Sequence, residues 1–299
     1  MKYELILVRY GEIALKGRET RNRFENTLVS NIKNAFNAEK LSTKIKKEWG
    51  RIYVHSDRIN ECLEVLCKIF GITSVSPAFQ TLSDMESISK LALNVSKEEL
   101  NEKKSFAIRT TRTGEHNFSS QDVAIKIGND IVKATKASVD LTNPDFELFI
   151  EIRNDKAFVF TEKIPCTGGM PINTQGKILA LINSPESILA AWYLIRRGCK
   201  AIFIATRESK NILERFIEKW YIKSKILTIP TENNTNSLIK EITKKNYCEA
   251  IVTGHTLNKN SIYDITKLKQ QINLPVLTPL ISMNENEIKT KVKEIGLPV

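Results

Sequence analysis

The chain has 299 residues, 41% hydrophobic and 26% charged, which suits a soluble protein of two or three domains. It has no run of 18 apolar residues and does not begin like a signal peptide, so we expect a cytoplasmic protein without a membrane partner. The net charge of +11 favours a polyanionic partner such as RNA. A Lys-rich composition typical of AT-rich or heat-adapted genomes explains the charge equally well.

The N-terminal part predicts a ferredoxin-like order of strands and helices. Strands are predicted over residues 3–8, 51–55 and 72–79, the last one ending near Pro77. A helix begins at Thr20 as N-cap, because apolar residues then recur every four positions from Phe24 to Phe36. A second helix carries Leu63, Leu66 and Phe70 and ends before Gly71. We place the first domain over residues 1–80.

The middle part predicts a second α+β domain over residues 81–167. Helices are expected over 88–100 and after Ser119, which forms a capping pattern with Asp122. Strand 105–112 carries Arg109 and Arg112 near its far end. Strands 146–152 and 157–161 form a hairpin across Asn154 and Asp155.

The C-terminal part, residues 168–299, alternates strands and helices. Strands are predicted over 178–182, 201–205, 226–229 and 250–253, and helices over 186–196, 210–220, 235–244 and 284–295. This order is typical of a doubly wound parallel sheet, whose ligands bind at the carboxyl ends of the strands. The turn 183–187 and the segment Gly254–His255 would lie at that edge.

Three motifs resemble the tRNA 4-thiouridine synthetase family. They are Arg-Tyr-Gly-Glu-Ile-x-Leu-Lys-Gly at 9–17, Gly-Gly-Met-Pro-Ile-x-Thr-x-Gly-Lys at 168–177 and Pro-Val-Leu-x-Pro-Leu-Ile at 275–281. The resemblance implies a mixed α/β and α+β fold with a ferredoxin-like N-terminal domain, a THUMP RNA-binding domain and an adenine nucleotide alpha hydrolase-like C-terminal domain. It also implies binding to the acceptor-stem region of tRNA, for which the basic candidates are Lys16, Arg18, Arg109 and Arg112. Arg109 and Arg112 are equally well explained as solvated charges at the end of a strand.

The family's pyrophosphate loop, Ser-Gly-Gly-x-Asp-Ser, is changed in this chain. The loop is one residue shorter, Asn183 and Ser184 stand in place of its glycines, and Glu186 replaces the Asp. The resemblance gives the candidate ATP-binding residues as Leu181, Ile182, Asn183, Ser184, Glu186, Ser187 and Gly254. Because glycines let phosphates approach the backbone, the change weakens the case for ATP as cofactor.

Other family residues are also replaced. His255, Asn258 and Lys259 stand where the family has Glu, Gly and Gln, and no residue matches the family's sulfur-carrying Cys. His255 is either a general base or a structural polar residue. The five cysteines, Cys62, Cys67, Cys166, Cys199 and Cys248, form no CxxC pair, so we expect neutral thiols and neither a metal cluster nor a disulfide framework.

Two functions follow from these changes. The first is a tRNA-binding protein whose ATP-dependent catalysis is impaired or lost, acting as a scaffold or as one subunit of a modification complex. The second is an active tRNA sulfurtransferase that adenylates uridine with ATP and receives sulfur from a separate carrier protein. The sequence leaves open whether the protein forms a homodimer.

Overall fold

The computed structural model describes residues 2–3, 5–228, 235–257 and 259–298. Its residues form two compact units, each assembled from three segments of chain. Unit 1 contains Met1–Arg9, Leu41–Cys67 and Ser74–Cys166, and unit 2 contains Tyr10–Lys40, Lys68–Thr73 and Thr167–Val299. The chain therefore passes between the two units several times.

Unit 1 is built on a mixed sheet with the strand order β2-β3-β1-β4-β8-β7-β5-β6, and β9 pairs beside β4. Its strands are β1 (Leu5–Tyr10), β2 (Lys44–Glu48), β3 (Arg51–His55), β4 (Ile72–Leu82), β5 (Ser105–Thr113), β6 (Ser138–Val139), β7 (Phe146–Arg153), β8 (Lys156–Phe160) and β9 (Ile164–Pro165). The β7–β8 hairpin turns at Asn154, whose φ of 52° lies in the left-handed region. The predicted hairpin is confirmed.

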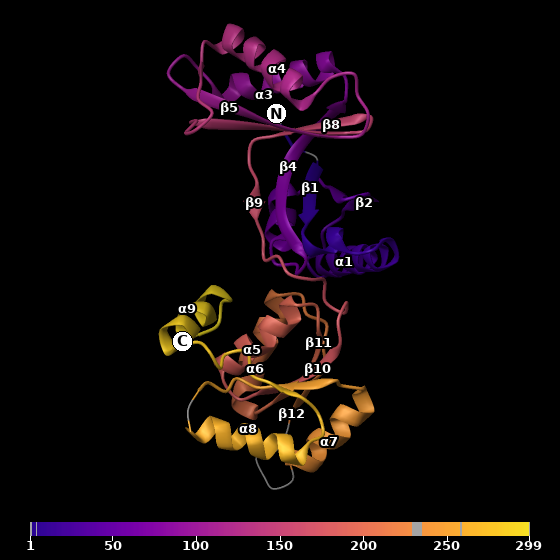
Figure 1. The fold of residues 1–299 in the computed structure, drawn as a ribbon, viewed down its shortest axis with the longest axis vertical. Helices are drawn as coiled ribbons and strands as arrows, with labels where there is room; N and C mark the ends of the chain where they lie inside the picture. Colours follow the sequence, from indigo (N-terminus) through magenta and orange to yellow (C-terminus); the bar gives the residue numbers. More distant parts are fainter. Residues whose placement is uncertain (1, 4, 229–234, 258, 299) are drawn as a thin grey trace. The chain divides into compact units, whose positions relative to one another are not determined.

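Two helices, α3 (Met85–Glu99) and α4 (Ser120–Thr135), lie together on one face of this sheet (Figure 1). Their apolar stripes meet the even-numbered residues of β5 and β7, such as Phe106, Leu148 and Ile150, in one buried core. Helix α4 begins with the predicted capping box, in which Ser119 and Asp122 bond to each other's backbone N–H.

Three predicted details of the N-terminal part are wrong. Helix α1 (Arg18–Ala38) begins two residues before Thr20, with Gly17 as its N-cap. Helix α2 (Ile59–Leu66) ends before Phe70, whose ring instead stacks on Trp220 in unit 2, 5.3 Å between centroids. Pro77 lies inside β4 rather than at its end. It is tolerated there because it falls between the segment paired with β9 and the segment paired with β8.

Unit 2 contains the predicted doubly wound sheet, with all strands parallel in the order β12-β11-β10-β13-β14. Residues alternate along β10, so that Ile178 and Ala180 face one core and Leu179 faces another. Helices α5, α6 and α9 cover the first face, and α7 and α8 cover the second (Figure 1). The elements are β10 (Lys177–Ile182), α5 (Pro185–Arg196), β11 (Lys200–Ala205), α6 (Arg207–Lys219), β12 (Ile226–Thr228), α7 (Thr235–Asn246), β13 (Ala250–Val252), α8 (Lys259–Gln271), β14 (Val276–Leu277) and α9 (Glu285–Glu294).

The backbone at Gly168 and Gly169 makes close contacts with other residues of unit 2. Gly169 has a φ of 79°, and a Cβ there would collide with the carbonyl oxygen of Arg196. Met170 donates its N–H to that same carbonyl at 2.9 Å. This part of the motif at 168–177 therefore joins the incoming chain to the end of α5.

Candidate functional site

The changed turn lies where the sequence placed it, between the carboxyl end of β10 and the start of α5. Ser184 is the N-cap, Pro185 occupies the first helical turn, and Ser184 and Ser187 form a capping box. The backbone N–H groups of Asn183 and Ser184 donate to Ser187 Oγ at 3.0 and 3.1 Å. Ser187 Oγ in turn donates to the carbonyl oxygen of Ser184 at 2.6 Å. These backbone donors, which could face an anion at a helix N-terminus, are thus bonded to a hydroxyl of the same turn.

The other predicted nucleotide residues are distributed around this turn. Leu181 and Ile182 direct their side chains into the two cores of unit 2. The carbonyl oxygen of Ile182 accepts hydrogen bonds from Thr206 N and Ser209 Oγ. Glu186 is half-buried in the first turn of α5. The backbone of the predicted segment therefore lies at the turn between β10 and α5. The side chains of Leu181 and Ile182 pack in the cores instead of facing the turn.

Gly254 packs directly against the turn. A Cβ added at Gly254 would lie 2.7 Å from both the N and the Cα atoms of Ser187, so glycine is required for this close approach. His255 bonds through Nδ1 to Thr253 Oγ1 at 2.8 Å, and its Nε2 lies 3.9 Å from Asp264 Oδ2. The sequence reasoning missed Asp264. Of the other two replaced residues, Asn258 and the side chain of Lys259 lie outside the described residues.

The motif at 9–17 makes specific internal bonds in both units. In unit 1, Arg9 donates to Ser76 Oγ at 2.9 Å and to Glu151 Oε2 at 3.2 Å. In unit 2, Tyr10 donates its hydroxyl to Glu25 at 2.6 Å. Also in unit 2, Glu12 accepts two bonds from Arg197, which lower the pKa of the Glu12 carboxyl. None of these partners lies close to its motif residue in the sequence.

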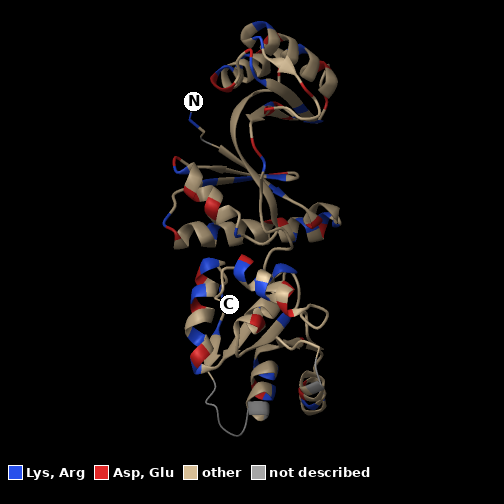
Figure 2. Ribbon diagram, turned by 90° about the vertical axis from the view of Figure 1, so that its left-hand side faces the viewer, with Lys and Arg blue, Asp and Glu red and all other residues tan. Residues whose placement is uncertain are grey.

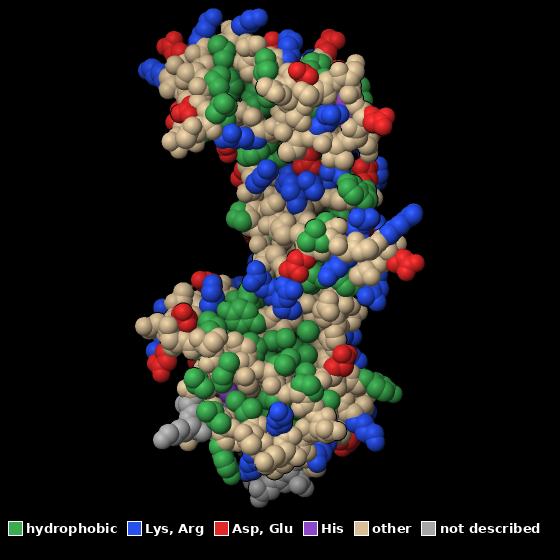
Figure 3. Space-filling model, viewed as in Figure 1, with side chains coloured by type: hydrophobic (Ala, Val, Ile, Leu, Met, Phe, Trp, Pro, Cys, Tyr) green, Lys and Arg blue, Asp and Glu red, His purple; other side chains and the backbone are tan. Residues whose placement is uncertain are grey.

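Glu151 gathers several cations on the face of the sheet opposite α3 and α4. Arg51 Nε donates to it at 2.7 Å and Arg153 at 3.4 Å, in addition to Arg9. Burial acts to raise the pKa of Glu151, but the charges of the three arginines outweigh it, and the pKa is lowered. Lys163 lies nearby over the Phe149 ring, 4.5 Å from its centroid. Lys and Arg side chains gather over β4 in the space-filling view (Figure 3).

Arg109 and Arg112 lie on opposite faces of β5, since side chains three positions apart on a strand point in opposite directions. Arg109 lies on the face of the sheet that carries Glu151, where it bonds to Glu147 Oε1 at 2.8 Å and to the carbonyl of Leu141. Arg112 bonds instead to the carbonyl of Gly114 and to His116. Its Nε is buried and meets no hydrogen-bond partner within the described chain.

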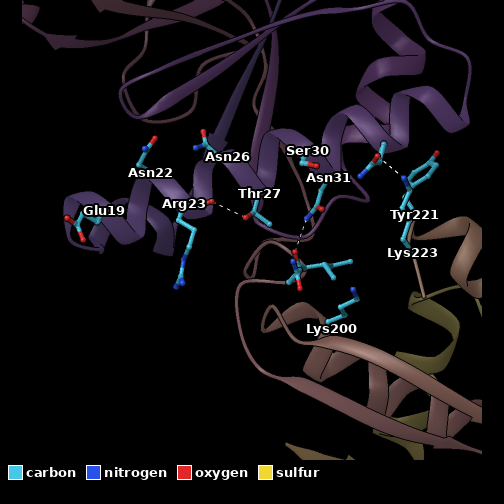
Figure 4. Close-up of a pocket in the computed structure, with 13 residues that line it drawn as sticks. Glu19, Asn22, Arg23, Asn26, Thr27, Ser30, Asn31, Lys200, Tyr221 and Lys223 are labelled. Carbon is cyan, nitrogen blue, oxygen red and sulfur yellow. Dashed lines mark hydrogen bonds between the residues drawn. The ribbon is translucent and has the colours of Figure 1, made fainter. Parts of the chain in front are cut away.

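Lys16 and Arg18 are exposed at the start of α1, whose N-cap Gly17 makes no side-chain cap bond. Positive charges at a helix N-terminus are electrostatically unfavourable because the helix dipole is positive there, and a bound anion would relieve this repulsion. A groove of about 730 Å³ follows this helix in unit 2 (Figure 4). Across it, Asn31 bonds to the Ile172 carbonyl and Lys223 bonds to Asn34. Most of the residues that line it are of polar type, among them Asn22, Arg23, Asn26, Thr27, Ser30, Asn31, Asn34, Lys200, Tyr221 and Lys223.

A metal site and a membrane-spanning helix each set requirements on the described residues. Its His, Cys, Asp and Glu side chains form no group of three or more that could hold a metal ion. None of its helices is long and apolar enough to cross a membrane.

Three family models match separate parts of the chain. The ThiI ferredoxin-like domain matches residues 5–76, the THUMP domain matches 83–162, and a model described as thiamine biosynthesis protein (ThiI) matches 208–297. The turn 183–187 lies outside the third range.

Curated relatives and solved structures match almost the whole chain. The probable tRNA sulfurtransferase of Methanobrevibacter smithii is 32% identical over 99% of this chain and 87% of its own length. That of Thermococcus kodakarensis is 31% identical over 98% and 88%. The crystal structure of PH1313 from Pyrococcus horikoshii superposes with a TM-score of 0.84 at 30% identity, covering 98% of this chain and 100% of that one. A 4-thiouridine synthetase–RNA complex with bound ATP gives a TM-score of 0.79 at 25% identity, covering 99% and 85%.

Proposed function

Because this chain belongs to the tRNA sulfurtransferase family, we propose that it binds tRNA and that its changed turn supports little or no ATP-dependent adenylation. The ferredoxin-like, THUMP and doubly wound parts of the family are all present.

The position of Ser187 Oγ is the observation that supports the proposed loss of ATP chemistry. It accepts the N–H groups of Asn183 and Ser184, so a phosphate would have to displace this hydroxyl before it could use those donors. Gly254 packs against Ser187 and leaves little room for the turn to open on that side. Glu186 also places its carboxylate one methylene further from the backbone than the Asp it replaces.

RNA binding is supported by the cations of both units. In unit 1, Arg109 and Lys163 lie on the same face of the sheet as the Glu151 cluster, where positive charges outnumber the carboxylates. In unit 2, Lys16 and Arg18 stand at the uncapped start of α1, and its groove carries Arg23, Lys200 and Lys223. Such an excess of Lys and Arg suits phosphate contacts, and the amide side chains along α1 suit ribose hydroxyls and base edges.

The second candidate is an active sulfurtransferase with a sulfur carrier in trans. The retained juxtaposition of α5, its N-terminal turn and Gly254 at the carboxyl edge of the sheet favours it. The solved relative with bound ATP, which has the same fold, favours it as well.

Two measurements on the purified protein separate these functions. Calorimetry with Mg-ATP is expected to give no heat of binding, and a mobility shift with a tRNA transcript at low salt is expected to show a complex. Formation of adenylyl-tRNA with repeated turnover would reject the loss of catalysis. Failure to bind any tRNA at low salt would reject the RNA-binding role, whatever the result with ATP.

The changed turn can also be replaced directly. Substitution of residues 183–187 by the six-residue loop Ser-Gly-Gly-Ile-Asp-Ser removes the Ser184 cap and supplies glycines that accept positive φ. We expect ATP binding to return in this variant, because the phosphates could then approach the backbone of the turn. A folded variant that still gives no ATP heat would place the defect beyond the turn, at His255, Asn258 or Lys259.

A further inference from the structure

Cys67 and Cys166 lie side by side in unit 1, although 99 positions separate them in the sequence. Their Sγ atoms are 2.8 Å apart, less than about 1 Å longer than a disulfide bond. Both side chains are half-buried. Backbone structure holds each residue, since Cys67 is the C-cap of α2 and Cys166 directly follows β9, which pairs with β4.

We propose that Cys67 and Cys166 form a reversible disulfide and constitute a thiol–disulfide exchange site whose substrate is a low-molecular-weight disulfide such as oxidised glutathione. The sequence alone predicted no disulfide, because the two cysteines belong to no spacing motif. The proposal is independent of the proposed RNA and ATP chemistry.

The exchange balances in two steps. The Cys67 thiolate attacks one sulfur of the small disulfide, forms a mixed disulfide and releases one small thiolate. The Cys166 sulfur then attacks Cys67 Sγ, loses its proton to water and releases the second small thiolate. The two cysteines are oxidised by two electrons, and the small disulfide is reduced to two thiols.

The local electrostatics set this order. The hydrogen bond with Cys166 lowers the pKa of the Cys67 thiol, whereas the same bond and burial raise the pKa of Cys166. Cys67 is therefore the residue that ionises first and attacks the external disulfide. Cys166, already in contact with it, resolves the mixed disulfide.

The position of the pair gives the bond a consequence. Cys67 and Cys166 are each the last residue of unit 1 before the chain crosses into unit 2. A bond between them would close a loop that contains α3, α4 and the strands between them, and long loops lose the most unfolded-chain entropy on closure. Oxidation should therefore raise the unfolding temperature of the intact protein by several degrees.

The experiment equilibrates the folded protein with mixtures of oxidised and reduced glutathione, quenches with acid, alkylates the free thiols and maps the peptides. We expect a Cys67–Cys166 cross-link in wild type, in Cys199→Ser and in Cys248→Ser, and none in Cys67→Ser or Cys166→Ser. The same mixtures applied to urea-unfolded protein should give at least about tenfold less of this cross-link, because only folding brings the two sulfurs together.

Two results would overturn the proposal. One is a folded protein that keeps both thiols alkylatable in the most oxidising mixture. The other is a cross-link that forms equally well in urea, which would show that the fold does not favour it. An unfolding temperature that does not change when the cross-linked protein is reduced would reject the stabilising consequence. The Cys67→Ser protein, treated identically, controls for effects of glutathione itself.

Discussion

Glu151 shows how one side chain can hold a charged cluster together. It is 4% exposed and accepts hydrogen bonds from Arg9, Arg51 and Arg153. Because the three cations come from three different strands, the carboxylate connects β1, β3 and β7. Removal of its charge would leave these guanidinium groups together in a poorly hydrated place.

We therefore expect Glu151→Gln to destabilise the protein by about 3 kcal/mol at neutral pH. Urea unfolding followed by circular dichroism measures this difference. Glu147→Gln is the matched control, because Glu147 pairs with Arg109 at an exposed position and its loss should cost at most about 1 kcal/mol. Equal effects of the two substitutions would contradict the role given to Glu151.

Glu48 gives a prediction for acid stability. Burial acts to raise the pKa of Glu48, but Lys156 and Lys46 donate to it and lower its pKa to about 2. A depressed carboxyl pKa stabilises the folded protein above the ordinary value of 4.5, and this contribution disappears as the pH falls towards 2.

Glu48→Gln should therefore be less stable than wild type at neutral pH, by at most about 3 kcal/mol, and equally stable near pH 2. Unfolding temperatures of both proteins across this pH range test the prediction. A difference that stays constant with pH would show that lost packing, and not lost charge, is responsible.

At the scale of elements, two glycines predict opposite outcomes. Gly128 lies inside α4, and a Cβ there would meet only Ile108 Cδ1 at 3.8 Å, which is ordinary contact. Gly128→Ala should stabilise the protein by about 0.5–1 kcal/mol, because alanine favours the helix more than glycine does. Gly169→Ala should destabilise it by more than about 1 kcal/mol, since φ is positive and Arg196 blocks the Cβ. Thermal unfolding of both variants measures the two changes in stability. If both substitutions changed the stability in the same direction, this prediction would be wrong.

At the scale of the whole molecule, Lys and Arg occur on elements of both units (Figure 2). If several of them bind phosphates, the logarithm of RNA affinity should fall linearly with the logarithm of salt concentration. Arg109→Ala should reduce that slope by about one. Arg112→Ala should affect RNA binding only indirectly, by changing the loop that contains its hydrogen-bond partners Gly114 and His116.

The control for RNA binding is Lys289→Ala on α9, whose exposed side chain lies outside the proposed surfaces. It removes one positive charge and should leave the slope unchanged. Binding that does not respond to salt, or that Lys289→Ala weakens as much as Arg109→Ala does, would show that no specific phosphate surface exists.

Local signals predicted much of this fold. The Ser119–Asp122 capping box, the turn at Asn154 and the alternation of strands and helices from β10 to β13 were read correctly, because each depends on neighbouring residues. Helix α8 and strand β14 were missed. In α8 the apolar side chains of Ile262 and Tyr263 are exposed, so the apolar residues of this helix form no clear stripe. Strand β14 has only two residues, which is too short for a strand pattern.

The site was predicted less completely than the fold. The turn at 183–187 and its neighbour Gly254 were placed together correctly, because both follow parallel strands. The bonding of Ser187 Oγ to the turn depends on one side-chain rotamer, which no sequence pattern specifies. The partnership of Arg9 with Glu151 joins residues 142 positions apart, and the contact of Cys67 with Cys166 has no local signal either.

The assembly of each unit from three segments limits how this gene could be rearranged. Helix α1 precedes the THUMP part in the chain, yet it bonds to Ile172 and Lys223 after it. A fragment that ends at Cys166 would carry α1 without these partners, and one that starts at Thr167 would lack the helix. Recombination that exchanges the C-terminal sheet of unit 2 must therefore also carry residues 10–40, although they are encoded far upstream.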